Sequence, residues 1–355
     1  MSPATAARSW RVTPAALLFP ASVCAALVAL LVVAEVTARR PAVRRALLTP
    51  SVGSPSRLFE RQLAGIEAFA AREGRVDCIA LGNSTALNGI DPQALDRGAR
   101  AAGGGSLSCY NFGVAGMTAS AAGAVAPILV DLYRPAVLVY IVSRRDVSPS
   151  VDGPLLANIP WIQYRHGDFS IAGWLTEHSR AYRYYLLYRQ WLDPVRWRVV
   201  AGPSLTTTAG YYPIDKGLPL SPALLAHAQR AYRDMVAQPI SEPELRGLTR
   251  LLELADADTQ LVVVEAPSHP RLRRWARATH SHARAMRQVQ QETRRHQVPF
   301  WSVPLTRIIP ADGWADFVHL NSRGAERFSH WLGARLSTVA PRGRGAREVA
   351  APTPG

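Results

Sequence analysis

The strongest pattern in the chain is an apolar run near its N-terminus. Residues 14–34 read PAALLFPASVCAALVALLVVA, 21 positions without a charge, and Arg8 and Arg11 precede them. At about 1.5 Å per residue, a helix of this length just spans the hydrocarbon core of a bilayer. No small-residue cleavage site follows before Glu35, so the run is typical of an uncleaved single-span anchor. A buried core helix is the alternative, but such helices have a polar side that this run lacks.

Beyond the anchor, amphipathic and fully apolar segments alternate. Residues 46–75 combine a linker with an amphipathic segment, RLFERQLAGIEAFAARE, which ends at Gly74. Helices are also predicted at residues 118–133 and from Ser322 onward. Short apolar segments predict strands near residues 76–81, 109–112, 135–142, 261–265 and 298–301. Buried strands that alternate with helices predict an α/β fold, in which a parallel sheet is covered on both faces.

The predicted organisation has four parts. Residues 1–45 form an N-terminal tail and transmembrane anchor, and residues 46–75 form the linker and amphipathic helix. Residues 76–338 form the α/β domain, interrupted at residues 150–250 by an aromatic-rich insertion without a strand pattern. Residues 339–355, rich in proline, arginine and alanine, are expected to be disordered.

Composition narrows the class of protein. The 355 residues are 48% hydrophobic, which is too apolar for a disordered chain and enough for a sizeable core. A single apolar run excludes a multi-span transporter. Three cysteines exclude a disulfide-rich scaffold, and no fixed repeat is present.

The charge balance is strongly basic, with 41 Lys and Arg against 26 Asp and Glu and a net charge of +15. Such a balance permits nucleic acid, anionic lipid or an acidic polymer as a partner. Many arginines fall within residues 271–295, where a solvated helix face is the ordinary interpretation and contact with anionic headgroups or an acidic glycan the sharper one. No nucleic-acid partner is predicted, because the aromatic residues lie elsewhere and no nucleic-acid-binding motif occurs.

Neither a metal nor a cofactor is predicted. The sequence has no His-Glu-x-x-His motif and no glycine-rich phosphate loop that opens a helix. Cys24 lies within the apolar run, whereas Cys78 and Cys109 lie on strands that would be neighbours. Adjacent parallel strands seldom give good disulfide geometry, so these two cysteines are expected to be buried thiols.

Polar motifs stand at the ends of the predicted segments. In chain order they are Gly82-Asn83-Ser84, the block from Asn111 to Gly116, Ser143-Arg144-Arg145-Asp146, and Asp316-x-x-His319. In open α/β sheets ligands bind outside the carboxyl ends of the strands, so these motifs are expected to converge on one edge. Taken singly, each motif is most simply a turn or a helix cap. Their order and placement together predict a site.

The residue types suit nucleophilic catalysis by serine. A serine hydroxyl is a poor nucleophile until a base takes its proton, and the base needs a third group to fix its tautomer. Asp316 and His319 are three residues apart before a helix, so both side chains can point into one cleft. Ser84, at a strand-to-helix turn, is the candidate nucleophile. The backbone N–H groups of Ser84 and Gly116 are candidates for stabilising an oxyanion.

This order of motifs resembles the SGNH/GDSL hydrolase superfamily over residues 76–338. The resemblance implies a flavodoxin-like, doubly wound parallel sheet. It also implies Ser84 as nucleophile, His319 as base, Asp316 as the group that orients the base, and Gly116 in the oxyanion hole. More narrowly, GNSTALNGIDP, YNFGVAGMTAS, SRRD and HLNSRGAERFSHWL behind one span are similar to membrane-anchored bacterial members. These include DltD-like proteins and relatives of the alginate acetylation machinery, which act on cell-envelope polymers.

Two blocks depart from the family pattern. Asn83 stands where the family usually has aspartate. Ser143 and Arg145 stand where it usually has glycine and an asparagine that donates to the oxyanion. Arginine also donates hydrogen bonds and carries a full charge, so Arg145 is a further candidate for the oxyanion site. The candidates for lining the substrate are Asn83, Asn111, Ser143 and His269.

Two functions from different classes follow. The first is a membrane-anchored serine esterase or O-acyltransferase that acts on O-acyl groups, chiefly O-acetyl, of a cell-envelope polysaccharide or other acylated polymer. Water as acceptor gives an esterase, and a sugar hydroxyl gives a transferase with a membrane protein as acyl donor. The second is a non-catalytic envelope assembly or glycan-binding protein that keeps the fold, which the departures at Asn83, Ser143 and Arg145 favour.

The flanking charges and the family resemblance predict opposite topologies. The positive-inside rule, applied to the arginines on both sides of the span, would leave the large domain in the cytoplasm. These arginines are Arg8, Arg11, Arg39, Arg40, Arg44 and Arg45. The resemblance implies a single-pass protein of the cytoplasmic (inner) membrane with an extracytoplasmic catalytic domain, and we adopt that placement.

Overall fold

Five short apolar segments form one parallel sheet. The computed structural model describes residues 14–40, 42–43, 50–150, 152–191, 206–256, 258–278 and 281–339. The strands are β1 (Cys78–Gly82), β2 (Cys109–Gly113), β3 (Val137–Val142), β4 (Gln260–Glu265) and β5 (Phe300–Trp301). Their order is β2-β1-β3-β4-β5, with all neighbours parallel. This is the flavodoxin-like order, so the predicted doubly wound α/β class is confirmed.

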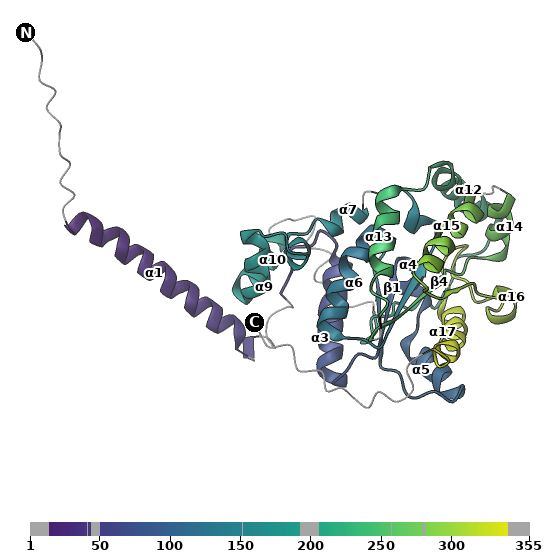
Figure 1. Cartoon of the computed structure of the whole chain (residues 1–355), viewed down its shortest axis with the longest axis horizontal. Helices are drawn as coiled ribbons and strands as arrows, with labels where there is room; N and C mark the ends of the chain where they lie inside the picture. The colour runs from purple at the N-terminus through teal and green to yellow at the C-terminus, as the bar shows by residue number, and fades with distance from the viewer. Residues whose placement is uncertain are drawn as a thin grey trace, which may run out of the picture.

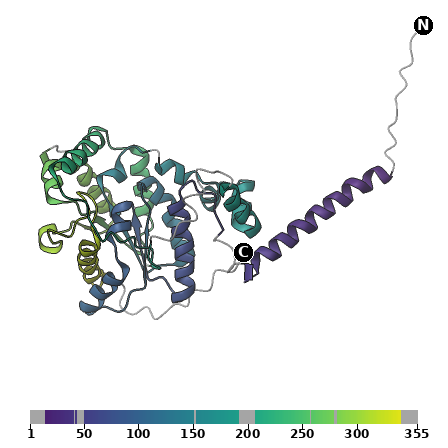
Figure 2. The same cartoon turned by 180° about the vertical axis from the view of Figure 1, so that it is seen from behind.

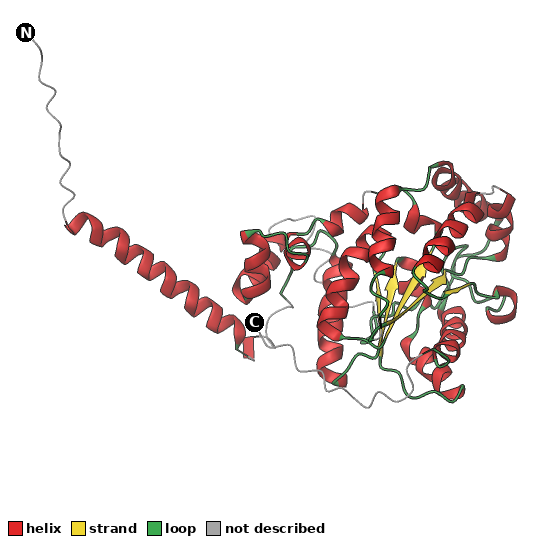
Figure 3. Cartoon of the chain, viewed as in Figure 1, coloured by secondary structure: helices red, strands yellow, loops and turns green. Residues whose placement is uncertain are grey.

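Helices cover both faces of the sheet (Figure 3). Those on one face are α3 (Arg57–Glu73), α6 (Ala119–Tyr133), α13 (Glu242–Leu252) and α15 (Ser281–Arg295). Those on the other are α4 (Ser84–Gly89), α5 (Pro92–Ala101), α16 (Leu305–Ile308) and α17 (Ser322–Leu336). Alternate residues of β1 join opposite cores: Ile79 and Leu81 pack with the first set of helices, and Cys78 and Ala80 with the second. The strands are therefore apolar throughout, because both of their faces are buried.

The amphipathic segment before the sheet forms α3 as predicted. Ser56 caps its N-terminus by accepting a hydrogen bond from the Phe59 backbone N–H at 3.3 Å. Gly74 ends the helix with φ of 71°, a conformation that glycine adopts at little cost. Phe59 and Ile66 are fully buried against the sheet, so the apolar stripe of α3 belongs to the core of the domain.

Helices α5 and α17 are packed backbone to backbone. A Cβ atom at Gly333 would overlap the Leu95 carbonyl oxygen, and one at Gly98 would overlap the His330 carbonyl oxygen. The two glycines therefore permit an approach that no larger residue allows. This contact fixes the last helix of the domain, and with it the loop that precedes α17.

Cys78 and Cys109 form a disulfide, so the expectation of two buried thiols is wrong. The two residues are register partners on β1 and β2, and their Cα atoms lie 4.4 Å apart. That separation is at the short end of the range a disulfide spans. The strand register therefore places the two cysteines directly opposite each other, within the distance that a disulfide can bridge.

Residues 150–250 form helices between β3 and β4, and their described part contains no strand. The helices are α7 (Asp152–Ala157), α8 (Pro160–Arg165), α9 (Ile171–His178), α10 (Arg180–Trp191), α12 (Pro222–Ala237) and α13, with the 3-10 turn η1 (Arg144–Val147) before them and α14 (Pro270–Ala278) after β4. Helix α13 packs against α6, where Glu244 accepts a hydrogen bond from the Ser120 N–H at 2.6 Å. One part of this region thus completes a layer of the sheet.

Helix α1 (Pro14–Arg39) extends away from the domain (Figure 1). Its window Ser22–Arg39 has a mean hydropathy of 1.9 and is 6% buried, so α1 is long and apolar enough to cross a membrane. Figure 2 shows from behind that α1 leaves the molecule beside α9 and α10. Disorder was predicted for residues 339–355. Val339 is described and packs partly buried against the core, and residues 340–355 lie outside the described residues.

Candidate active site

The β1–α4 turn exposes a single side chain, that of Ser84. All the other residues from Leu81 to Ile90 are buried. Gly82 brings the turn close to β3, because a Cβ atom there would lie 2.7 Å from the Ile141 carbonyl oxygen. Asn83 caps α4, its Oδ1 accepting a hydrogen bond from the Thr85 N–H at 2.8 Å. The turn therefore holds the Ser84 hydroxyl at the carboxyl edge of the sheet.

The loop before α17 presents Asp316 and His319 to the same edge. The loop is closed by a bridge between Trp314 and Leu320, and Asn321 caps α17 by accepting a hydrogen bond from the Gly324 N–H at 3.0 Å. Because α17 is fixed on α5, the loop has a rigid support. The three-residue spacing of Asp316 and His319 in the sequence predicts that both side chains point into one cleft.

Ser84, His319 and Asp316 form one hydrogen-bonded chain. His319 Nε2 lies 2.9 Å from Ser84 Oγ, and His319 Nδ1 lies 2.8 Å from Asp316 Oδ2. An ionised carboxylate can only accept, so Nδ1 carries the ring proton and donates it to Asp316. The lone pair of Nε2 then faces the Ser84 hydroxyl, which is the arrangement a general base requires.

Asp316 is held in its charged form. Burial alone would raise the pKa of this carboxyl, but hydrogen bonds from His319 and from the backbone N–H groups of Val318 and His319 lower it below the ordinary value. Those two backbone bonds to Oδ1 are 2.6 and 2.7 Å long. Asp316 therefore remains an acceptor for Nδ1 in neutral and mildly acidic solution.

The block after β2 lies beside the Ser84 turn. The Val114 N–H donates to the Gly82 carbonyl at 2.9 Å, which joins the ends of β1 and β2. Gly116, two residues further on, has φ of 82° and is partly exposed. The structure thus places Gly116 at the same edge as the serine, where an oxyanion donor would be needed.

Asn83 and Asn111, both expected to line the substrate, are buried instead, so this expectation is wrong for both. Asn111 is fully buried, and its Nδ2 donates to the carbonyls of Ala86 and Ile90 at 2.9 and 2.8 Å. It therefore holds the end of α4 to β2. Asn83 is 2% exposed and is turned toward β3. Buried amides pair with nearby backbone and carboxylate groups because an unpaired amide is costly.

Asp146 is the partner that sequence reasoning missed. Asn83 Nδ2 donates to Asp146 Oδ2 at 2.8 Å, and the Ser143 N–H donates to the same oxygen at 2.8 Å. Tyr140 donates to Oδ1 at 2.9 Å. Complete burial raises the pKa of Asp146 to about 6, although its hydrogen bonds oppose the rise. The sequence signal for Asp146 was an acidic residue four positions after the end of a wholly apolar strand.

The departure at Asn83 is explained by this pairing. An amide at position 83 can donate to Asp146, whereas an aspartate would place a second carboxylate in the same buried pocket. Ser143 belongs to the same cluster, since its hydroxyl donates to Asp146 at 2.5 Å. Arg145 is exposed at the carboxyl end of β3, between the buried Arg144 and Asp146.

Substituting Asn83→Asp is expected to destabilise the protein by about 3 kcal/mol at pH 7, because two buried carboxylates would face each other. The deficit should shrink toward pH 5: the paired carboxyls have folded-state pKa values above their unfolded ones, so the folded state gains stability as pH falls through them. Thermal unfolding of the full chain in detergent at both pH values measures this. Asn158→Asp, at an exposed position, is the control. An equal deficit at both pH values would contradict the pairing.

His269, the remaining lining candidate, lies behind the loop that carries the base. Its N–H donates to the Phe317 carbonyl at 3.0 Å, and its ring packs edge-on against Trp314 and Phe317. Burial lowers the pKa of His269, and the nearby Arg271 lowers it further. The neutral ring thus supports the loop from the side of β4. No group of three or more His, Cys, Asp or Glu side chains that could hold a metal ion occurs in the described part of the chain.

The fold and site together define an α/β protein of flavodoxin-like topology with a Ser–His–Asp chain at the carboxyl edge of its sheet. Two of the solved structures that are similar to it are a lipase/acylhydrolase and a GDSL-like lipase. The lipase/acylhydrolase from Enterococcus faecalis is 13% identical, with a TM-score of 0.34, over 76% of this chain and 99% of that one. A GDSL-like lipase from Parabacteroides merdae ATCC 43184 is 14% identical, with a TM-score of 0.33, over 74% and 97%. No protein-family model and no curated protein matches the sequence.

Proposed function

We propose that the protein is a membrane-anchored serine enzyme of the SGNH/GDSL type, which removes or transfers O-acyl groups, chiefly acetyl, on a cell-envelope polysaccharide. The observation that carries the proposal is the hydrogen-bonded chain from Ser84 through His319 to Asp316. The motif order on the sequence supports the envelope substrate, and the basic composition of the chain suits an acidic polymer.

In the proposed mechanism, Ser84 Oγ attacks the ester carbonyl while His319 Nε2 takes its proton. Asp316 stabilises the imidazolium that forms. The backbone N–H groups of Ser84 and Gly116 are assigned to the oxyanion, and the exposed Arg145 adds positive charge at the same edge. Collapse of the tetrahedral intermediate releases the alcohol, to which His319 returns the proton, and leaves an acyl-Ser84.

The second half of the reaction decides between hydrolysis and transfer. His319 takes a proton from the incoming nucleophile, which attacks the acyl-serine carbonyl and frees Ser84 Oγ. Water gives a carboxylic acid, and a sugar hydroxyl gives a new ester. A transferase would receive its acyl group from a membrane protein, which the anchor α1 would keep nearby.

The disulfide supports an extracytoplasmic position for the domain. Disulfides persist in oxidising compartments and are rare in the cytoplasm, and Cys78–Cys109 is buried within the sheet. This argument opposes the one from the flanking arginines. We therefore place the protein in the cytoplasmic membrane as a single-pass protein with its domain outside the cytoplasm.

The alkylation pattern of the full chain tests this topology. Protein isolated from membranes and denatured without reductant is expected to take one maleimide, on Cys24, which is free. After reduction it should take three, the number of cysteines in the chain. In a Cys24→Ala control both counts fall by one. Three labels before reduction would place the domain in a reducing compartment.

A non-catalytic glycan-binding protein is the second candidate, favoured by Arg145 in place of the family's asparagine. The full chain in detergent with p-nitrophenyl acetate separates the two. Release of nitrophenol above the rate of the same preparation treated with a fluorophosphonate supports serine acyl chemistry. Polysaccharide acceptors then show whether acetyl goes to sugar or to water. A folded protein with no release, with or without acceptors, and no labelling by the fluorophosphonate would favour the binding protein.

A further inference from the structure

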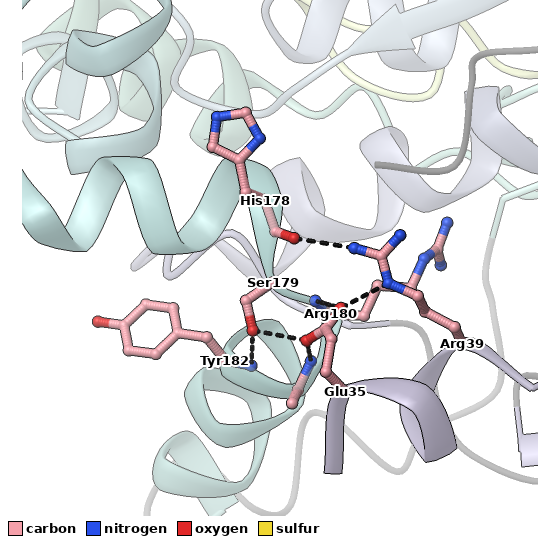
Figure 4. A network of polar contacts seen from close by, with 7 residues as sticks. Glu35, Arg39, His178, Ser179, Arg180 and Tyr182 are labelled. Carbon is pink, nitrogen blue, oxygen red and sulfur yellow. Dashed lines mark hydrogen bonds and ion pairs between the residues drawn. The ribbon is translucent and has the colours of Figure 1, made fainter. Parts of the chain in front are cut away.

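The end of α1 is bound to the corner between α9 and α10 (Figure 4). Glu35 accepts a hydrogen bond from Ser179 Oγ at 2.8 Å. It also accepts from the backbone N–H groups of Arg180 and Ala181, both at 3.1 Å. These amides belong to the first turn of α10, which has no intrahelical acceptor for them. A carboxylate of α1 therefore caps a helix of the α/β domain.

Arg39, one turn further along α1, binds the other side of the corner. It forms an ion pair with Glu35 at 2.7 Å, and its Nη2 donates to the His178 carbonyl, the last residue of α9, at 3.0 Å. The carboxylate thus faces the positive end of α10 and the guanidinium the negative end of α9. Ala38 packs beneath them with Tyr184 and Leu187 of α10. The match of these two charges to the helix ends and the packing of Ala38 hold α1 on the corner.

Exposed apolar side chains are concentrated on α9 and α10, the two helices that meet at this corner, and just before α9. Among the described residues after α1, the large hydrophobic side chains that are exposed include Phe169 (74%), Ile171 (70%), Trp174 (45%), Tyr185 (54%) and Tyr188 (39%). We call these five residues the corner patch. Ile171 and Trp174 are one turn apart on α9, and Tyr185 and Tyr188 are one turn apart on α10, so each pair shares a helix face. The other two exposed large hydrophobic side chains among the described residues after α1 are Leu155 and Leu218.

The position of Glu35 on α1 sets the depth that the α9–α10 corner would have relative to a bilayer. The uncharged run of α1 ends at this residue, so in a bilayer Glu35 would stand where the hydrocarbon core gives way to headgroups. Since Glu35 is hydrogen-bonded to α10, the corner patch would lie near the same depth, at the boundary between hydrocarbon core and headgroups. Tryptophan and tyrosine favour that layer. Helix α10 carries arginines and no acidic residue, which suits anionic headgroups.

We propose that the corner patch lies in the interfacial layer of the bilayer that α1 crosses. The inference rests on the proposed membrane anchoring and adds a second, adjoining contact with lipid. A domain tethered only by a linker can turn freely, whereas one held by α1 and the corner patch keeps one end on the membrane. The carboxyl edge of the sheet, with Ser84, then has a fixed orientation relative to the lipid surface.

Depth labelling of the full chain tests the proposal. In a Cys24→Ala background, single cysteines at Ile171→Cys, Val28→Cys and Leu218→Cys are labelled with a nitrobenzoxadiazole fluorophore. The proteins are placed in vesicles of phosphatidylcholine and phosphatidylglycerol. The label at 171 is expected to emit at shorter wavelength than the one at 218 and to lose most of its emission when brominated lipids are used. The label at 28, within α1, should behave as fully buried in lipid, and the one at 218 should be quenched by aqueous iodide.

The three labels distinguish a failure of the proposed contact between corner patch and lipid from a failure of the proposed membrane anchor. If 28 is in lipid and 171 behaves like 218, the corner patch does not touch the bilayer and the inference is overturned, while the anchor stands. If 28 is also exposed to iodide, the proposed anchoring itself fails. If 171 is shielded in native membranes but not in vesicles of pure lipid, a protein covers the patch, which overturns the assignment to lipid.

Discussion

Ser84→Ala is expected to lower kcat/KM toward p-nitrophenyl acetate by on the order of 10⁴-fold or more, because no other group on the turn can form the acyl intermediate. The structure gives the reason: Ser84 is the one side chain of the β1–α4 turn that reaches out of the core and within 2.9 Å of a base. Initial rates of nitrophenol release by parent and variant, both as full chains in detergent, provide the measurement.

The matched control for this variant is Ser337→Ala. Ser337 follows α17 and its hydroxyl donates to the Ala334 carbonyl at 2.8 Å, far along the helix from His319. Its loss should leave the rate unchanged. A fluorophosphonate probe should label the parent and Ser337→Ala but not Ser84→Ala. Undiminished turnover or labelling without Ser84 would remove the serine from the mechanism.

Asp316→Asn is expected to lower kcat by about 10⁴-fold at neutral pH. An asparagine amide in this position can donate to His319 Nδ1, which moves the ring proton to Nε2 and points it at Ser84. The serine then faces a donor and loses its base. KM should change little, since Asp316 acts through His319 and not on the substrate.

Asp312→Asn is the control for the charge change. Asp312 is an exposed residue of the same region, paired with Arg323 on the surface, so its loss should have little effect on kcat. The lowered pKa of Asp316 also predicts how stability depends on pH. The stabilisation from the Asp316 carboxylate is present above its unfolded-state pKa and is lost as pH falls through its lower folded-state pKa. In Asp316→Asn that acid-side loss should be smaller. Equal kcat in parent and Asp316→Asn would show that the carboxylate does not set the tautomer.

Much of the fold was readable from the sequence because the strands are buried on both faces. Such strands appear as short runs without polar residues, and parallel strands bring their carboxyl ends to one edge. Ser84 and Asp316-x-x-His319 could therefore be assigned to one place although 235 residues separate Ser84 from His319. The relation needed only strand direction and chain order, both of which a sequence carries.

Pairings between side chains on different elements were not readable in the same way. Asn83 was expected to face the substrate, but strand register turned it toward Asp146 on the η1 turn. Cys78 and Cys109 were expected to stay reduced, but they are register partners. Glu35 reads as the end of an apolar run, and its role as a cap for α10 depends on where a distant helix begins. Local pattern contains no information about such distances.

The docking of α17 on α5 has a consequence for the order in which the protein matures. A chain made from its N-terminus completes the β1–α4 turn with Ser84 early, whereas the loop that carries His319 gains its support only when α17 has been made and packs on α5. Until Gly333 reaches Leu95, that loop has no rigid support and His319 is not held beside Ser84. Under the function proposed above, a partly synthesised or truncated chain would therefore be inert toward esters, and activity would begin only when the whole domain has closed.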